Sequence, residues 1–223
     1  MSIGENYLRI RNEIPGHVRI VLAAKTRQPG EVAEAIEAGA TDIGENYVQE
    51  AAAMIQALGE KAEAVTWHMI GELQKNKINK ALPIFDVIQT IDSLEKAIAV
   101  DKRAARFEKV VPVLIEINSA AEPNKSGLAP DSSVAETVAK GISQLKHLHL
   151  QGVMTMGPLG ADPEDVRPFF RKTREIFEHL KELEISGVEM NTLSMGMSDS
   201  YRVAIEEGTN MVRLGTIIFG PRF

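Results

Sequence analysis

Lys25 stands where an apolar run ends, and its amine is a candidate nucleophile. The preceding residues 18–24 read VRIVLAA, which is typical of a buried strand. An amine at the end of such a strand is partly desolvated, which disfavours the protonated form and favours attack on an aldehyde. On position alone, a lysine that extends from the rim into water is the more common arrangement.

Two short segments of small and hydroxylated residues could bind a phosphate. Residues 194–198 read SMGMS, and Gly215 and Thr216 follow the last apolar run of the chain. Backbone N–H groups and hydroxyls in such segments can approach a phosphate closely. The alternative is that the glycines only turn the chain.

Arg213 lies inside the apolar run MVRLG. A guanidinium buried there requires groups that accept its hydrogen bonds. A bound ligand would supply them, and so would a structural ion pair with a strand carboxylate such as Glu116. His68, in WHMIG, is read as a half-buried histidine with satisfied hydrogen bonds.

The elements that would position these groups alternate along the whole chain between short apolar runs and segments of helical period. A helix with an apolar stripe from Ile3 to Ile14 opens the chain. Ser198 and Asp199 are predicted to cap another helix, which begins near Tyr201. Eight strands are predicted, at residues 18–24, 41–43, 64–70, 84–91, 110–117, 149–156, 188–193 and 211–214.

Eight strands separated by helical segments predict an α/β fold, a single (β/α)₈ TIM-type barrel with an extra N-terminal helix, over residues 1–223 as one domain. An open doubly wound sheet is the alternative, but it usually has a glycine-rich first turn, and residues 25–30 read KTRQPG. Barrel sites lie at the C-terminal ends of the strands. We therefore expect Lys25, Asn46, residues 194–198 and residues 215–216 at one rim.

The composition excludes several function classes. A net charge of −6 argues against nucleic acid or an anionic membrane as a partner. With no cysteine, disulfides and thiolate chemistry are excluded, and the scattered histidines predict no metal site. The first residues contain no apolar run, and no stretch is long enough to span a membrane. We expect a cytoplasmic protein.

The chain resembles the pyridoxal 5'-phosphate (PLP) homeostasis, or PLP-binding, protein family, which shares the barrel of bacterial alanine racemase. The resemblance spans nearly the whole chain. It is carried by AAKTRQ at 23–28, GENYVQE at 44–50, WHMIGELQKNK at 67–77, EINSAAEPNKSGL at 116–128, LQGVMTMGP at 150–158 and LSMGMSDSYRVAIEEGTNMVRLGTIIFGPR at 193–222.

The resemblance implies a role for each matching residue. Lys25 would hold PLP as an internal aldimine, a Schiff base, and Arg213 would approach the pyridine nitrogen. Asn46 matches a polar residue near the cofactor. Many members have serine or threonine before the lysine, where this chain has Ala24, so a small hydrogen-bond donor is missing there. The phosphate would be bound by the last two loops, through Ser194, Gly196, Gly215 and Thr216.

The same resemblance favours a non-enzymatic role. An arginine at the pyridine nitrogen keeps that nitrogen unprotonated, which makes the ring a poorer electron sink. The second base of alanine racemase comes from another domain of a partner subunit, and this chain ends just after strand eight. We expect a monomeric carrier that buffers PLP, without catalytic residues and with PLP-accepting apoenzymes as candidate partners.

Two other functions stay open. One is a PLP-dependent amino-acid racemase, in which Lys25 is one base and Tyr47 or His68 the second. The other is a barrel that binds a different phosphorylated metabolite without forming an imine. Exchange of an α-proton separates the first from a carrier, and a near-visible imine band separates the second.

Overall fold

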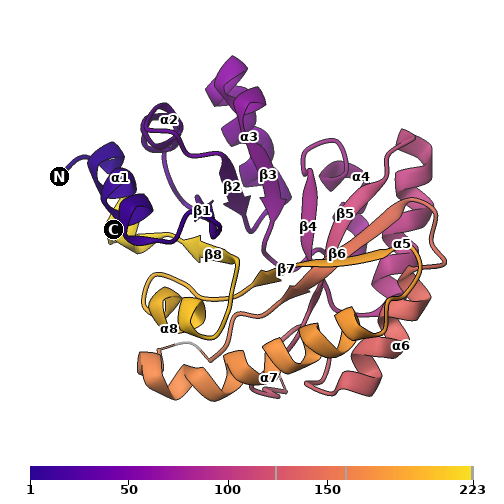
Figure 1. Cartoon of the computed structure of the whole chain (residues 1–223). Coiled ribbons are helices and arrows are strands. Elements are labelled where there is room, and N and C mark those ends of the chain that lie inside the picture. Colours follow the sequence, from indigo (N-terminus) through magenta and orange to yellow (C-terminus); the bar gives the residue numbers. More distant parts are fainter. Residues whose placement is uncertain (124, 159, 222–223) are drawn as a thin grey trace.

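The structure is a computed structural model that describes residues 1–123, 125–158 and 160–221; Asn124, Leu159, Arg222 and Phe223 lie outside the described residues. Within these ranges, eight parallel strands close into a barrel in the order β1 to β8, with helices around it (Figure 1). The predicted (β/α)₈ barrel is confirmed. The strands are β1 (Arg19–Ala23), β2 (Asp42–Glu45), β3 (Thr66–Met69), β4 (Val87–Ile91), β5 (Val111–Glu116), β6 (Leu148–Met154), β7 (Val188–Ser194) and β8 (Met211–Leu214).

The extra N-terminal helix lies beside the last helix, so that the first and last helices are neighbours (Figure 1). Ser2 and Glu5 form a capping box that fixes where it begins. The Asn6 side chain donates a hydrogen bond to the Ile218 carbonyl oxygen at 3.1 Å. The α-helices are α1 (Ile3–Glu13), α2 (Pro29–Glu37), α3 (Val48–Leu58), α4 (Ile78–Ala81), α5 (Leu94–Ala104), α6 (Ser132–Ile142), α7 (Pro163–Glu182), α8 (Tyr201–Glu206) and α9 (Thr216–Phe219).

Alternation along β1 divides the core into two parts. Ile20 and Leu22 belong to the large apolar cluster between strands and helices. Val21, the residue between them, belongs to a separate small cluster with Ile70 and Met211. Because successive strand residues point to opposite faces, this second cluster lies inside the barrel. Among the described helices, none has both the length and the hydropathy that crossing a bilayer requires.

Two predicted strands begin two or three residues before the observed ones. Residues 59–64 form a 3₁₀ helix, so β3 begins only at Thr66. Residues 84–86 were predicted as the start of the fourth strand, but the N–H groups of Ile84 and Phe85 both bond back to the Ala81 carbonyl oxygen. Phe85 is fully buried in this turn, and so its apolar character does not indicate a strand.

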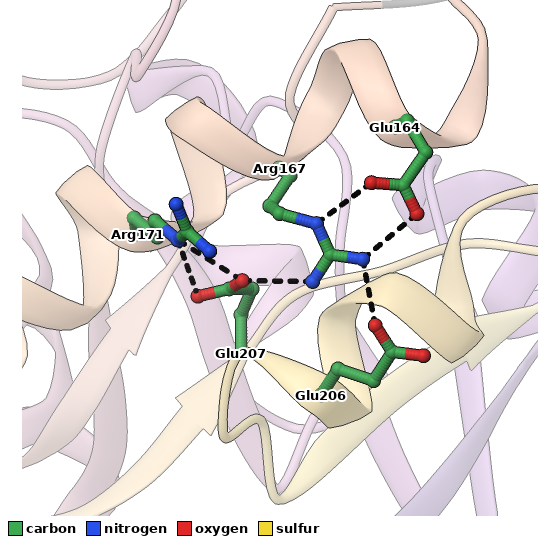
Figure 2. A network of polar contacts seen from close by, with 5 residues as sticks. All are labelled: Glu164, Arg167, Arg171, Glu206 and Glu207. Atoms are coloured by element: carbon green, nitrogen blue, oxygen red, sulfur yellow. Dashed lines mark hydrogen bonds and ion pairs between the residues drawn. The ribbon is translucent and has the colours of Figure 1, made fainter.

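An ion-pair network fastens α7 to the end of α8 (Figure 2). Arg167 donates to Glu164 and Glu206 on the surface and to Glu207, whose carboxylate is buried and also accepts from Arg171. The two arginines hold the pKa of Glu207 below its ordinary value, although burial raises it. Since α8 follows the loop after β7, this network supports that loop from behind.

Candidate functional site

A cavity of about 610 Å³ opens at the C-terminal ends of the strands, where barrel sites are expected. Its size fits a small-molecule ligand. We call it the mouth cavity. Its described lining residues are Ala23, Lys25, Asn46, Ile70, Met156, Met197, Ser198, Asp199, Arg213, Gly215, Thr216 and Pro221.

Lys25 lies in a tight turn directly after β1. The Ala24 N–H extends the strand ladder by bonding to the Gly44 carbonyl oxygen at 2.9 Å. The Arg27 N–H then bonds to the Ala24 carbonyl oxygen at 2.9 Å, and Thr26 has a left-handed φ of 65°. The turn places the half-buried Lys25 side chain in the cavity wall, as predicted from the strand end.

Asn46 reaches the cavity because the chain after β3 approaches it closely. A Cβ atom added at Gly71 would lie 2.4 Å from the Asn46 carbonyl oxygen, which leaves no space for a side chain at that position. Asn46 also lines a smaller neighbouring depression with Tyr47 and Lys77. The predicted position of Asn46 at the rim is therefore observed.

Ser198 connects the loops that follow β7 and β8. Its hydroxyl oxygen accepts hydrogen bonds from the Gly215 N–H at 3.1 Å and the Ile217 N–H at 3.3 Å. The prediction that Ser198 and Asp199 cap α8 is wrong, because Ser200 is the N-cap residue and makes no side-chain capping bond. Ser198 faces the cavity instead, beside Gly215 and Thr216.

Ser194 and Gly196 are not among the described residues that line the mouth cavity. Ser194 is fully buried, and its hydroxyl donates to Gln89 and accepts from Arg213. Gly196, at a φ of 93°, is packed so tightly against α8 that a Cβ atom would lie 2.5 Å from that of Ala204. Both residues thus lie behind the loop whose Met197 and Ser198 line the cavity.

Arg213 crosses from the barrel interior into the cavity wall. Its guanidinium donates to the Ser194 hydroxyl at 2.7 Å and to the Thr155 carbonyl oxygen at 2.7 Å. Burial lowers the pKa of Arg213 to about 10, so that it stays charged at neutral pH, and the charge of Glu116 opposes this shift. The Oε2 atom of Glu116 has no hydrogen-bond partner among the described residues, and burial raises the pKa of Glu116 itself to about 7.

Tyr47 and His68, the candidates for a second base, are not described lining residues of the mouth cavity. Tyr47 is exposed at its edge. His68 is fully buried rather than half-buried, and its two ring nitrogens bond to Asp42 and Gln89. Burial lowers the pKa of His68, although the Asp42 carboxylate opposes the shift.

Arg27 holds the end of the described chain beside the cavity. Its guanidinium donates to the carbonyl oxygens of Phe219 at 3.3 Å and Pro221 at 3.4 Å, and to that of Gly220 between them. It also lies over the Phe219 ring, 5.4 Å from the centroid. The sequence motifs did not single out this residue, because its partners are backbone groups almost 200 positions away.

Glu45 is a buried carboxyl group next to the Lys25 turn. It ends β2 and is only 1% exposed, and its Oε2 has no hydrogen-bond partner among the described residues. Burial raises its pKa to about 7, the charge of Glu50 adds to the shift, and the Lys25 charge opposes it. The folded protein therefore binds a proton that the unfolded chain releases near pH 4.5.

Glu45→Gln should change how stability depends on pH. Because the folded pKa lies above the unfolded one, Glu45 lowers the free energy of unfolding as pH rises from about 4.5 to about 7. The variant should gain on the order of 2 kcal/mol over the wild type at pH 8 relative to pH 5. Urea unfolding at both pH values measures this, with exposed Glu60→Gln as control. An equal difference at both pH values would refute the assignment.

Comparisons with known proteins place the chain in a family. The family model of the alanine racemase N-terminal domain matches residues 2–222. A pyridoxal phosphate homeostasis protein of Pasteurella multocida is 37% identical over 100% of this chain and 98% of its own length. The chain belongs to the pyridoxal phosphate homeostasis protein family. A member from Haemophilus influenzae is 36% identical over 98% of the chain and 91% of its own length.

Several solved structures have the same barrel. PipY of Synechococcus elongatus without PLP superposes with a TM-score of 0.91 at 30% identity, over 98% of this chain and 100% of that one. PipY with PLP bound gives 0.87 at 29% identity over the same shares. Alanine racemase of Clostridium difficile gives 0.79 at 17% identity, over 99% of this chain and 57% of that one, which shows a shared fold.

Proposed function

We propose that this chain is a cytoplasmic PLP carrier that holds its cofactor in the mouth cavity and buffers it in PLP homeostasis. The observation that carries the proposal is that Lys25 and the buried Arg213 line one cavity with the small-residue loops after β7 and β8. Relatives named for PLP homeostasis, and PipY with PLP bound, support the choice of cofactor.

The residues present fit the parts of PLP. The Lys25 amine would condense with the aldehyde to form an imine, with loss of one water, and Arg213 would donate to the ring nitrogen. PLP supplies a reactive aldehyde on a charged, aromatic ring. Asn46 would contact the ring from the β2 side of the cavity.

The phosphate would lie at the loops after β7 and β8. Gly215 and Thr216 line the cavity there, and a Cβ atom at Gly215 would be in ordinary van der Waals contact with Ala23, 3.5 Å from its carbonyl oxygen. Ser198 adds a hydroxyl at the same place. We propose that Ser194 and Gly196 act from behind, by fixing Arg213 and the loop.

A carrier fits these residues better than a racemase. Arg213 keeps a positive charge at neutral pH, which disfavours protonation of a ring nitrogen beside it and weakens the ring as an electron sink. Neither Tyr47 nor His68 lines the described cavity as a second base. We further propose that the protein acts as a monomer and gives PLP to apoenzymes.

Proton exchange at the α-carbon of amino acids tests this proposal. The PLP-loaded protein is incubated with each amino acid in deuterated water, and deuterium incorporation is followed by mass spectrometry. We expect exchange no faster than that of free PLP, together with release of PLP to an apoenzyme. Efficient exchange that is lost in Lys25→Ala would establish the racemase instead.

A further inference from the structure

Five buried polar side chains form a continuous hydrogen-bonded row through the barrel interior. We call it the interior polar chain. Its members come from five different strands and are each at most 4% exposed. In order from the mouth cavity downward, they are Arg213, Ser194, Gln89, His68 and Asp42. Barrel interiors are usually filled by branched apolar side chains, so a polar row in this position requires an explanation.

The contacts along the row are short. Arg213 Nη1 lies 2.7 Å from Ser194 Oγ, which lies 2.7 Å from Gln89 Oε1. Gln89 Nε2 lies 3.0 Å from His68 Nδ1, and His68 Nε2 lies 2.8 Å from Asp42 Oδ1. The three inner members therefore have a hydrogen-bond partner on each side. The two outer members, Arg213 and Asp42, carry full charges.

With the Gln89 amide oriented so that its oxygen faces Ser194, one arrangement of protons satisfies the row. A guanidinium only donates, so the Ser194 oxygen must accept from Arg213 and pass its own proton to the Gln89 carbonyl oxygen. The Gln89 amide nitrogen then donates to His68 Nδ1, which leaves the His68 proton on Nε2, facing the Asp42 carboxylate. A protonated His68 would set two donors against each other at Gln89, and burial lowers the pKa of His68 accordingly.

All donors in the interior polar chain thus point the same way, from the cationic Arg213 to the anionic Asp42. Hydrogen bonds aligned in this way polarise and strengthen one another in a buried environment. The two ends are also anchored. Arg213 donates its second bond to the Thr155 carbonyl oxygen, and Asp42 accepts from Arg19 and Thr41.

From this row we infer that Gln89 is a positioning residue for the ligand, which acts through Ser194 to fix how the Arg213 guanidinium meets the ring nitrogen. Gln89 has no other described polar partner than His68, Ser194 and the Met211 sulfur. Replacing it would remove the partner that fixes the Ser194 hydroxyl, so the Ser194 side chain could change rotamer and would hold the guanidinium less firmly. The inference rests on the proposed binding of PLP in the mouth cavity.

Comparing PLP with its 1-deaza analogue, in which a carbon replaces the ring nitrogen, tests the inference. We expect the wild type to prefer PLP by about tenfold and Gln89→Leu by about twofold, because one charged hydrogen bond is loosened. Affinity for the analogue should change little. Dissociation constants come from equilibrium dialysis, with the near-visible absorption band of the bound ligand as a second readout.

Two further variants make the result decisive. Ser194→Ala removes the neighbouring link and should lower the preference for PLP in the same way, even if Gln89→Leu fails to fold. Thr173→Val removes a buried hydroxyl that bonds only within α7, and should keep the wild-type preference. Equal weakening of both ligands in Gln89→Leu and Ser194→Ala would overturn the inference. If the wild type binds neither PLP nor its analogue, the proposed function itself is wrong.

Discussion

Lys25→Ala should abolish the near-visible absorption band that PLP acquires on binding, and should weaken binding by on the order of 100-fold, or about 2.7 kcal/mol. Lys25 is the described lysine in the cavity wall, and the remaining contacts to the ring and phosphate are noncovalent. Titration of the apoprotein with PLP, followed by absorbance and by equilibrium dialysis, measures both effects.

A matched lysine separates this effect from a general loss of positive charge. Lys77 is half-buried in the depression beside the mouth cavity, which it shares with Asn46. Lys77→Ala should keep the absorption band and change the PLP affinity by less than about threefold. A band that survives in Lys25→Ala but disappears in Lys77→Ala would show that Lys77, and not Lys25, forms the covalent bond.

Arg213→Met should lower both stability and PLP affinity. The variant leaves the Ser194 hydroxyl and the Thr155 carbonyl oxygen without their donor, and it removes the cation that opposes the burial-raised pKa of Glu116. Unpaired buried polar groups of this kind reduce the free energy of unfolding by roughly 2–4 kcal/mol. Urea unfolding of the apoprotein measures the loss, and a PLP titration should show at least about tenfold weaker binding.

Arg213→Lys is the informative companion variant. It restores the charge but not the planar fork that reaches Ser194 and Thr155 together. We expect it to recover less than half of the stability and little of the PLP affinity. If Arg213→Met unfolds at the same urea concentration as the wild type, the two buried hydrogen bonds do not contribute to the free energy of unfolding as we expect.

The sequence predicts the outline of this fold because local signals are strong there. Apolar runs ending at Ala24 and Leu214 mark strands whose ends carry Lys25 and Gly215, and both lie at the cavity as expected. The error at residues 84–86 has a physical cause, since Phe85 is buried as deeply in a turn as it would be in a strand. Burial alone does not distinguish the two.

The sequence does not show which of Ser194 and Ser198 lies in the cavity wall. Both are serines in SMGMS, and only the register of β7 decides that the first points into the barrel and the second lies in the cavity wall. The interior polar chain is equally hidden, because Asp42, Gln89 and Arg213 are far apart in sequence and meet only when the barrel closes. Contacts between residues so far apart leave no periodic pattern in the local sequence.

Borohydride reduction of the PLP-loaded wild-type protein, followed by peptide mass mapping, tests the central claim most directly. Reduction makes the bond between the amine and the aldehyde carbon permanent, so the label stays on the residue that formed it. We predict one phosphopyridoxyl group per chain, on the peptide that contains Lys25. A label on another lysine, or no label on a protein that has bound PLP, would contradict the account.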